Sequence, residues 1–156
     1  MSARRILVTG GAGYIGSTTC LALLEAGHSI VVVDNLSNSS QIALERVRDL
    51  APAGAELEFH RVDIRDTAAL DAVVAAAPID AVIHFAAFIA VGESTREPEK
   101  YFHNNTGGSI SLFSAMADAG VDKLVFSSTA AVYGNPDEVP IPETAAIRAV
   151  NPYGES

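Results

Sequence analysis

Residues 9–16 read Thr9-Gly10-Gly11-Ala12-Gly13-Tyr14-Ile15-Gly16, and they follow directly on the apolar run of residues 5–9. A short apolar run that ends in glycines is typical of a buried strand. Apolar residues then recur with helical spacing over residues 14–26, up to Gly27, which predicts a helix. The stretch therefore predicts a strand, a tight glycine turn and a helix in immediate succession.

The three glycines at every third position each have a mechanical reason. Gly10 permits the tight turn out of the strand, and Gly13 removes a side chain where a pyrophosphate must approach the backbone. Gly16 lets the helix pack close to the sheet. A pyrophosphate at the start of this helix would face free N–H groups and the positive end of the helix dipole. The turn predicts a dinucleotide-binding site.

Strand-like and helix-like segments alternate along the rest of the chain. The predicted strands are residues 5–9, 29–33, 56–62, 81–85 and 123–127. The predicted helices are residues 14–26, 42–50, 67–77 and 98–119, with a further helix starting near Pro152 and a loop over residues 134–149. This order predicts the α/β class, a doubly wound parallel sheet of the Rossmann type. Right-handed crossovers then favour the strand order 3-2-1-4-5.

Asp34 ends the second predicted strand, 24 residues after Gly10. An acidic residue at about this distance, roughly 20 residues, binds the adenosine ribose in dinucleotide-binding folds. Its carboxylate accepts hydrogen bonds from the ribose hydroxyls and repels a 2′-phosphate. No Arg or Lys lies between Asp34 and Gln41. The sequence therefore favours NAD over NADP as the cofactor.

Composition and charge restrict the remaining possibilities. The chain has 156 residues and a net charge of −9, which disfavours nucleic acid as a partner. No apolar run approaches the roughly 20 residues needed to span a bilayer, and nothing resembles a signal peptide. Cys20 is the single cysteine, which fits a reducing compartment, and no metal-ligand spacing is present. We expect a cytoplasmic protein without membrane or metal.

Several stretches resemble a known family. The glycine spacing resembles that of the extended short-chain dehydrogenase/reductase family. Within it, the chain is similar to the UDP-glucose 4-epimerases along nearly its whole length. The stretches that carry this resemblance are residues 34–40 (DNLSNSS), Asp63-Ile64, residues 84–87 (HFAA), residues 91–94 (VGES), Asn104-Asn105, residues 127–134 (SSTAAVYG) and residues 151–156 (NPYGES).

The resemblance implies an activity and a set of site residues. The implied reaction is epimerisation at C4 of UDP-galactose and UDP-glucose through a transient 4-keto sugar, by a homodimer with bound NAD. Tyr153 would be the general base, and Thr129 would hydrogen-bond the reacting oxygen. Together with the glycine turn, it implies these cofactor-binding residues: Gly10, Gly13, Tyr14, Ile15, Gly16, Asp34, Asn35, Ser37, Asn38, Ser39, Asp63, Ile64, Phe85, Ala86, Ala87, Ile89 and Asn104.

Two departures from the family pattern matter. Some members carry a lysine where this chain has Ile89, so one charged cofactor contact is absent. The family's Tyr-x-x-x-Lys motif would place its lysine four residues after Tyr153, beyond Ser156. We therefore expect residues 1–156 to form an incomplete NAD-binding Rossmann domain, which lacks the last strands and the C-terminal sugar-binding region. By itself this domain should be inactive.

Other interpretations stay open at this stage. A related nucleotide-sugar epimerase, dehydratase or decarboxylase would share the fold. A dehydratase should carry an Asp-Glu pair after Thr129, where this chain has Ala130-Ala131. A non-catalytic NAD-binding module is the third possibility. Among single residues, His84 is better interpreted as a buried strand residue than as a ligand, and Asn104 could equally make a structural hydrogen bond.

Overall fold

A computed structural model describes residues 2–156 of the chain, which form two compact units. The first unit, here called the sheet unit, comprises the residues up to Ala86 together with Gly108–Ser127. The second, here called the helical unit, comprises Ala87–Gly107 and Ser128–Ser156. The chain thus leaves the sheet unit after its fourth strand, returns along a helix, and leaves again after its fifth strand.

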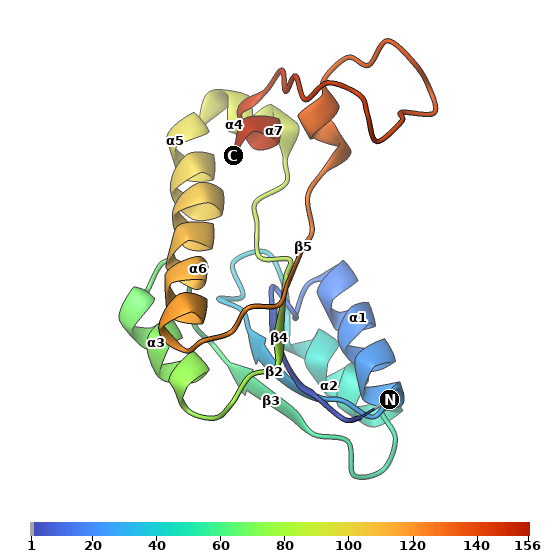
Figure 1. The fold of residues 1–156 in the computed structure, drawn as a ribbon, viewed down its shortest axis with the longest axis vertical. Helices are drawn as coiled ribbons and strands as arrows, with labels where there is room; N and C mark the ends of the chain where they lie inside the picture. Colours follow the sequence, from blue (N-terminus) through green and yellow to red (C-terminus); the bar gives the residue numbers. More distant parts are fainter. Residues whose placement is uncertain (1) are drawn as a thin grey trace. The chain divides into compact units, whose positions relative to one another are not determined.

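Five parallel strands form the sheet (Figure 1). They are β1 (Arg5–Thr9), β2 (Ser29–Val33), β3 (Leu57–His60), β4 (Ala81–His84) and β5 (Leu124–Phe126). Their order, β3-β2-β1-β4-β5, confirms the predicted topology. The third strand is shorter than predicted, because only Leu57–His60 pairs with its neighbour β2.

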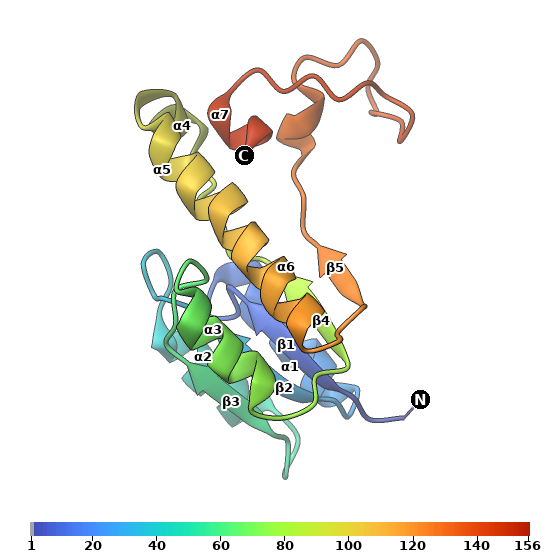
Figure 2. The same ribbon diagram turned by 60° about the vertical axis from the view of Figure 1, so that its left-hand side comes forward.

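Helices cover both faces of the sheet (Figures 1 and 2). On one face, α1 (Tyr14–Glu25) and α2 (Gln41–Leu50) enclose an apolar core. On the other face, α3 (Thr67–Ala75) and α6 (Gly108–Asp118) enclose a second core. Alternate residues of the central strands point into opposite cores, as Leu7 and Val8 of β1 do. Burial on both faces explains why these strands are apolar without alternation.

Five short helices make up the regular structure of the helical unit. They are α4 (Val91–Arg96), α5 (Pro98–Tyr101), the π-helix η1 (Phe102–Gly107), the 3-10 helix η2 (Ala130–Tyr133) and α7 (Pro152–Glu155). The predicted continuous helix over residues 98–119 is therefore interrupted, since a π-helical segment separates α5 from α6. The interruption ends at Gly107, which is followed by Gly108. Glycine favours an α-helix less than every other residue except proline. Helix α4, which begins Val91-Gly92, was not predicted from the sequence.

Candidate functional site

The glycine turn has the close contacts that only glycine allows. Gly10 has a φ of 69°, and a Cβ there would lie 2.6 Å from the backbone nitrogen of Ala86. A Cβ on Gly16 would overlap the carbonyl oxygen of Gly10, whereas one on Gly13 would lie 3.3 Å from that oxygen. Gly16 thus packs the helix against the turn itself. Gly10 brings the turn against the backbone that follows β4.

The start of α1 is open. Gly13 is the N-cap residue and supplies no side-chain hydrogen bond. The first N–H groups of an α-helix have no partner within the helix. Tyr14 is 91% exposed and Ile15 58% exposed, so the first turn of the helix is accessible. This arrangement can receive a phosphate group through backbone N–H donors, as predicted for residues 10–16.

Asp34 lies at the end of β2 and is buried. Its Oδ2 accepts a hydrogen bond of 3.0 Å from the backbone N–H of Ala12. Its Oδ1 accepts from the backbone N–H of Leu36 at 2.9 Å and from the hydroxyl of Ser39 at 2.7 Å. One carboxylate therefore connects the glycine turn with the loop over residues 35–40. Two carboxylate oxygens offer about four acceptor positions, which leaves room for a ligand hydroxyl.

The loop after Asp34 has an unusual backbone. Leu36 has a φ of 61°, in the left-handed region that leucine rarely adopts. Its neighbour Ser37 donates its N–H to the Oδ1 of Asn35 at 2.9 Å. Ser37 and Asn38 are exposed, whereas Ser39 faces Asp34. Side-chain acceptors on both sides of Leu36 thus hold this strained loop in place.

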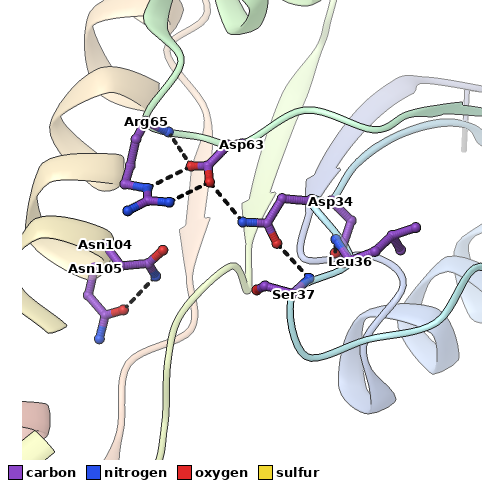
Figure 3. A network of polar contacts seen from close by, with 8 residues as sticks. Asp34, Leu36, Ser37, Asp63, Arg65, Asn104 and Asn105 are labelled. Atoms are coloured by element: carbon purple, nitrogen blue, oxygen red, sulfur yellow. Dashed lines mark hydrogen bonds and ion pairs between the residues drawn. The ribbon is translucent and has the colours of Figure 1, made fainter. Parts of the chain in front are cut away.

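A second carboxylate, that of Asp63, lies beside the same loop (Figure 3). Asn35 donates to its Oδ2 at 2.9 Å, and Arg65 donates to both of its oxygens at 2.9 and 2.7 Å. The hydrogen bonds from Arg65, assisted by that from Asn35, hold the pKa of Asp63 well below its usual range. Asp63 is therefore a negative acceptor that Arg65 and Asn35 hold in place.

Ile64 contacts its surroundings through its side chain, whereas the residues just after β4 contact theirs through their backbones. The side chain of Ile64 is buried and packs against Gly108, where a Cβ would lie 2.6 Å from its Cγ1. Phe85 and Ala86 lie against Gly10 through their backbones. A cofactor contact at these positions must therefore use mainly backbone atoms.

A buried polar chain lies below the glycine turn, within the sheet unit. The Nδ1 of His84 lies 2.5 Å from the hydroxyl of Thr9, and its Nε2 lies 3.1 Å from the hydroxyl of Ser109. Burial lowers the pKa of His84 to about 4, so its ring is neutral at physiological pH. This geometry supports the interpretation of His84 as a structural strand residue.

In the helical unit, Asn105 clamps the segment after β4. Its side-chain oxygen accepts from the N–H of Phe88 at 2.9 Å, and its nitrogen donates to the carbonyl of Phe88 at 3.1 Å. Asn104 donates to the same oxygen at 3.0 Å (Figure 3). Both asparagines lie in the π-helix, a feature often found at functional sites. Asn105 thus fixes the backbone near Ala87 and Ile89, the latter being 65% exposed.

The two residues expected to act on the substrate lie in the helical unit. Thr129 caps η2, and its hydroxyl accepts from the N–H of Ala131 at 3.1 Å, so its hydrogen remains free to donate. Tyr153 lies in the first turn of α7, which Asn151 caps through the N–H of Gly154 at 2.9 Å. A Cβ on Gly154 would lie 2.7 Å from the carbonyl oxygen of Ala131. This close approach packs the segment that carries Tyr153 against the turn that Thr129 starts.

The structure thus distributes the expected site residues over both units. The sheet unit brings together those of the glycine turn, the loop after β2 and the segments after β3 and β4 up to Ala86. The helical unit holds Ala87, Ile89, Asn104, Thr129 and Tyr153. Sequence reasoning missed the contributions of Arg65 and Asn105. The only sequence feature that pointed to either residue was the position of Asn105 as the second of two adjacent asparagines in a predicted helix.

Two further features are absent from residues 2–156. No helix within them has the length and apolar character needed to cross a membrane. No group of three or more His, Cys, Asp or Glu side chains in that range could hold a metal ion.

The chain is similar to known proteins along its whole length. It is 54% identical over 155 residues to "UDP-glucose 4-epimerase 2" of Arabidopsis thaliana, which covers 99% of this chain and 44% of that protein. Among solved structures, UDP-glucose 4-epimerase from Stenotrophomonas maltophila, with bound NAD and formylated UDP-arabinopyranose, is 49% identical with a TM-score of 0.92. The match covers 97% of this chain and 45% of that one.

A third relative carries a wider substrate description. The UDP-Glc/GlcNAc 4-epimerase of Campylobacter jejuni is 43% identical with a TM-score of 0.90, over 98% of this chain and 45% of that one. The chain therefore spans less than half the length of these relatives. Residues 6–156 also match the model of a family described as "NAD dependent epimerase/dehydratase family". This match covers nearly all of the chain, which therefore belongs to the NAD dependent epimerase/dehydratase family.

Proposed function

We propose that the complete protein containing these residues binds NAD and interconverts UDP-galactose and UDP-glucose by epimerisation at C4. The glycine turn bonded to Asp34 carries the cofactor part of this proposal. The similarity to UDP-glucose 4-epimerases over 99% of the chain supports the choice of substrate. We further propose that this protein acts in the cytoplasm as a homodimer.

The residues of the sheet unit fit NAD. The cradle at Gly10, Gly13 and Gly16 is open where a pyrophosphate would meet the N–H groups of α1. The carboxylate of Asp34 has an acceptor position left for a ribose hydroxyl. Its negative charge opposes the 2′-phosphate of NADP. The adenosine loop, residues 35–40, and Asp63 would bind the rest of the nucleoside.

The reaction needs a base, and Tyr153 is proposed to supply it. An alcohol proton is too weakly acidic to leave without a base within hydrogen-bonding reach. Tyr153, acting as a phenolate, takes the proton of the sugar 4-hydroxyl onto its own oxygen, and the free hydroxyl hydrogen of Thr129 donates to the sugar oxygen. The glycine turn and Asp34 would hold NAD, which would supply the reversible acceptor for the hydride of C4. Tyr153 then returns the proton.

A second candidate substrate has an observation in its favour. The Campylobacter jejuni relative acts on the N-acetylated sugar as well, by its description. UDP-N-acetylglucosamine is therefore the second candidate for the same site and the same chemistry. Activity with both sugars would assign the broader specificity.

The test uses the complete protein loaded with NAD. Incubation with UDP-galactose should yield UDP-glucose without net release of NADH, and Tyr153→Phe should reduce the rate by at least about 100-fold, as expected for loss of general base catalysis. The control is Tyr133→Phe, which removes a hydroxyl from the neighbouring η2 helix. If the NAD-loaded protein fails to convert either sugar, the proposed function is wrong. If Tyr153→Phe keeps full activity, the role of Tyr153 is wrong.

A further inference from the structure

The ring of Tyr153 lies against a second, buried tyrosine. Tyr101, at the end of α5, is 0% exposed. Its ring centroid is 6.5 Å from that of Tyr153, with an angle of 74° between the ring planes. This edge-to-face arrangement is one of the favoured geometries for aromatic pairs. Both residues belong to the helical unit.

The hydroxyl of Tyr101 is anchored on both sides. It donates to the Oε2 of Glu93 at 2.8 Å and accepts from the N–H of Ala90 at 3.1 Å. The other oxygen of Glu93 accepts from Lys100 at 2.6 Å. The hydrogen bond from Lys100, then that from Tyr101, lowers the pKa of Glu93. Glu93 is therefore a charged acceptor that keeps the hydroxyl of Tyr101 in one place.

A second ring contact restricts Tyr101 further. The ring of Phe88 lies 5.8 Å from that of Tyr101, centroid to centroid. The ammonium group of Lys100 lies 5.0 Å from the centroid of Phe88. Since Asn105 clamps the backbone of Phe88, this neighbour is itself fixed. Tyr101 is thus held at its hydroxyl end and along its ring.

Tyr153 has less support from its own element. Helix α7 spans only Pro152–Glu155, and the side chain of Tyr153 is partly exposed. A helix of four residues cannot by itself fix the direction of a side chain, whereas a base must meet its proton within a narrow range of distance and angle. The orientation of Tyr153 must therefore depend on what its ring touches.

We propose that Tyr101 is a positioning residue for Tyr153: its buried ring, anchored by Glu93 and Ala90, holds the ring of Tyr153 in the orientation needed for proton removal. This inference rests on the proposed function, because it needs Tyr153 to act as the base. Tyr101 itself touches neither substrate nor cofactor in this account. Its contribution is to the rate of the chemical step and not to the binding of the sugar.

The test compares two substitutions of Tyr101 in the complete, NAD-loaded protein. Tyr101→Leu removes the ring and should lower kcat for UDP-galactose by about tenfold or more, since small displacements of catalytic groups have effects of this size. KM and bound NAD should stay within about twofold, because sugar binding is left intact. Tyr101→Phe keeps the ring but loses the hydrogen bonds to Glu93 and Ala90, and it should recover only part of kcat. The kinetic isotope effect with UDP-galactose deuterated at C4 should rise in Tyr101→Leu, because chemistry becomes more limiting.

Phe102→Leu is the control, since it removes the adjacent aromatic ring, at the first residue of η1, where the side chain is 39% exposed. An equal fall of kcat in Tyr101→Leu and Phe102→Leu, or an unchanged isotope effect in Tyr101→Leu, would overturn the proposal. A kcat in Tyr101→Phe no higher than in Tyr101→Leu would also overturn it, because the ring would then not be the active part. Tyr153→Phe in parallel separates the two claims: full activity in that variant contradicts the proposed base, independently of Tyr101.

Discussion

The backbone N–H of Ala12 donates a hydrogen bond of 3.0 Å to the carboxylate of Asp34. This bond joins the glycine turn to the end of β2. The same carboxylate holds the following loop through Leu36 and Ser39. Asp34 thus organises the proposed cofactor site before any ribose reaches it. A change of this side chain is expected to affect both the folding of the chain and the proposed binding of NAD. The two effects must therefore be measured separately.

Asp34→Asn should weaken NAD binding and folding together. The amide has one acceptor oxygen instead of two, so at least one of the donors from Ala12, Leu36 and Ser39 loses its partner. An unsatisfied buried group costs about 1–3 kcal/mol, and we expect a loss of stability of this size with a fall in NAD affinity of about tenfold or more. Calorimetric titration and denaturant unfolding measure the two effects. Asp49→Asn, at an exposed position of α2, should change neither, and unaltered NAD affinity in Asp34→Asn would contradict the ribose contact.

Gly10→Ala should destabilise the chain much more than Gly27→Ala. Both glycines have positive φ, 69° and 83°. A left-handed alanine therefore lowers the stability of each variant by about 1–2 kcal/mol. Around Gly27 a Cβ would meet nothing within 4 Å, whereas at Gly10 it would lie 2.6 Å from backbone. The difference in unfolding free energy therefore isolates the close approach between the turn and Ala86. Equal losses in the two variants would show that the turn can open at little cost.

The stability of the chain should depend on His84 between about pH 4 and pH 6.5. Burial lowers the pKa of His84 from 6.5 to about 4, so the unfolded chain binds an extra proton in this range. The stabilising contribution is complete above pH 6.5 and is lost as the pH falls toward 4, with an upper limit of about 3 kcal/mol. His84→Gln should remove this part of the pH dependence, measured as the difference between the two unfolding curves. His103→Gln, at an exposed position, should retain it, and a wild-type slope in His84→Gln would contradict the buried neutral ring.

The β5 edge should promote association of the 156-residue chain. β5 pairs only with β4 among the strands described for residues 2–156, and Val125 and Phe126 are 62% and 49% exposed. Unpaired, apolar edge strands are templates for pairing with other chains. Val125→Lys should therefore reduce concentration-dependent association in light scattering, with little change in unfolding free energy. Val139→Lys changes a more exposed valine of the loop, 81% exposed, and an equal reduction there would point to charge alone.

The sheet could be predicted from the sequence because its three central strands are apolar on both faces and end at glycines or polar residues. Such local patterns do not contain contacts between distant residues, and this explains the error in the helix predicted over residues 98–119. The π-helical segment depends on hydrogen bonds between Asn105 and Phe88, which are 17 residues apart, and no local pattern contains that contact. The helix predicted to begin at residue 67 is capped by Asp66, whose carboxylate accepts from the N–H of Ala69 at 3.1 Å.

The site was predicted unevenly for the same reason. The glycine turn and Asp34 are recognisable because backbone geometry demands particular residue types at particular spacings. Tyr101 gave no such signal, since a buried aromatic residue on a helix is expected in any core. Its contact with Tyr153 joins residues 52 positions apart in the chain and exists only after folding. Positioning residues of this kind are visible from the structure alone.

The left-handed backbone at Leu36 has a consequence for binding. A free loop loses conformational entropy when a ligand orders it, and that loss weakens the affinity. Here the folded chain already holds the rare conformation before binding, through the flanking acceptors of Asp34 and Asn35. A nucleoside that meets this loop finds a surface already in shape, and most of its contact energy can appear as affinity.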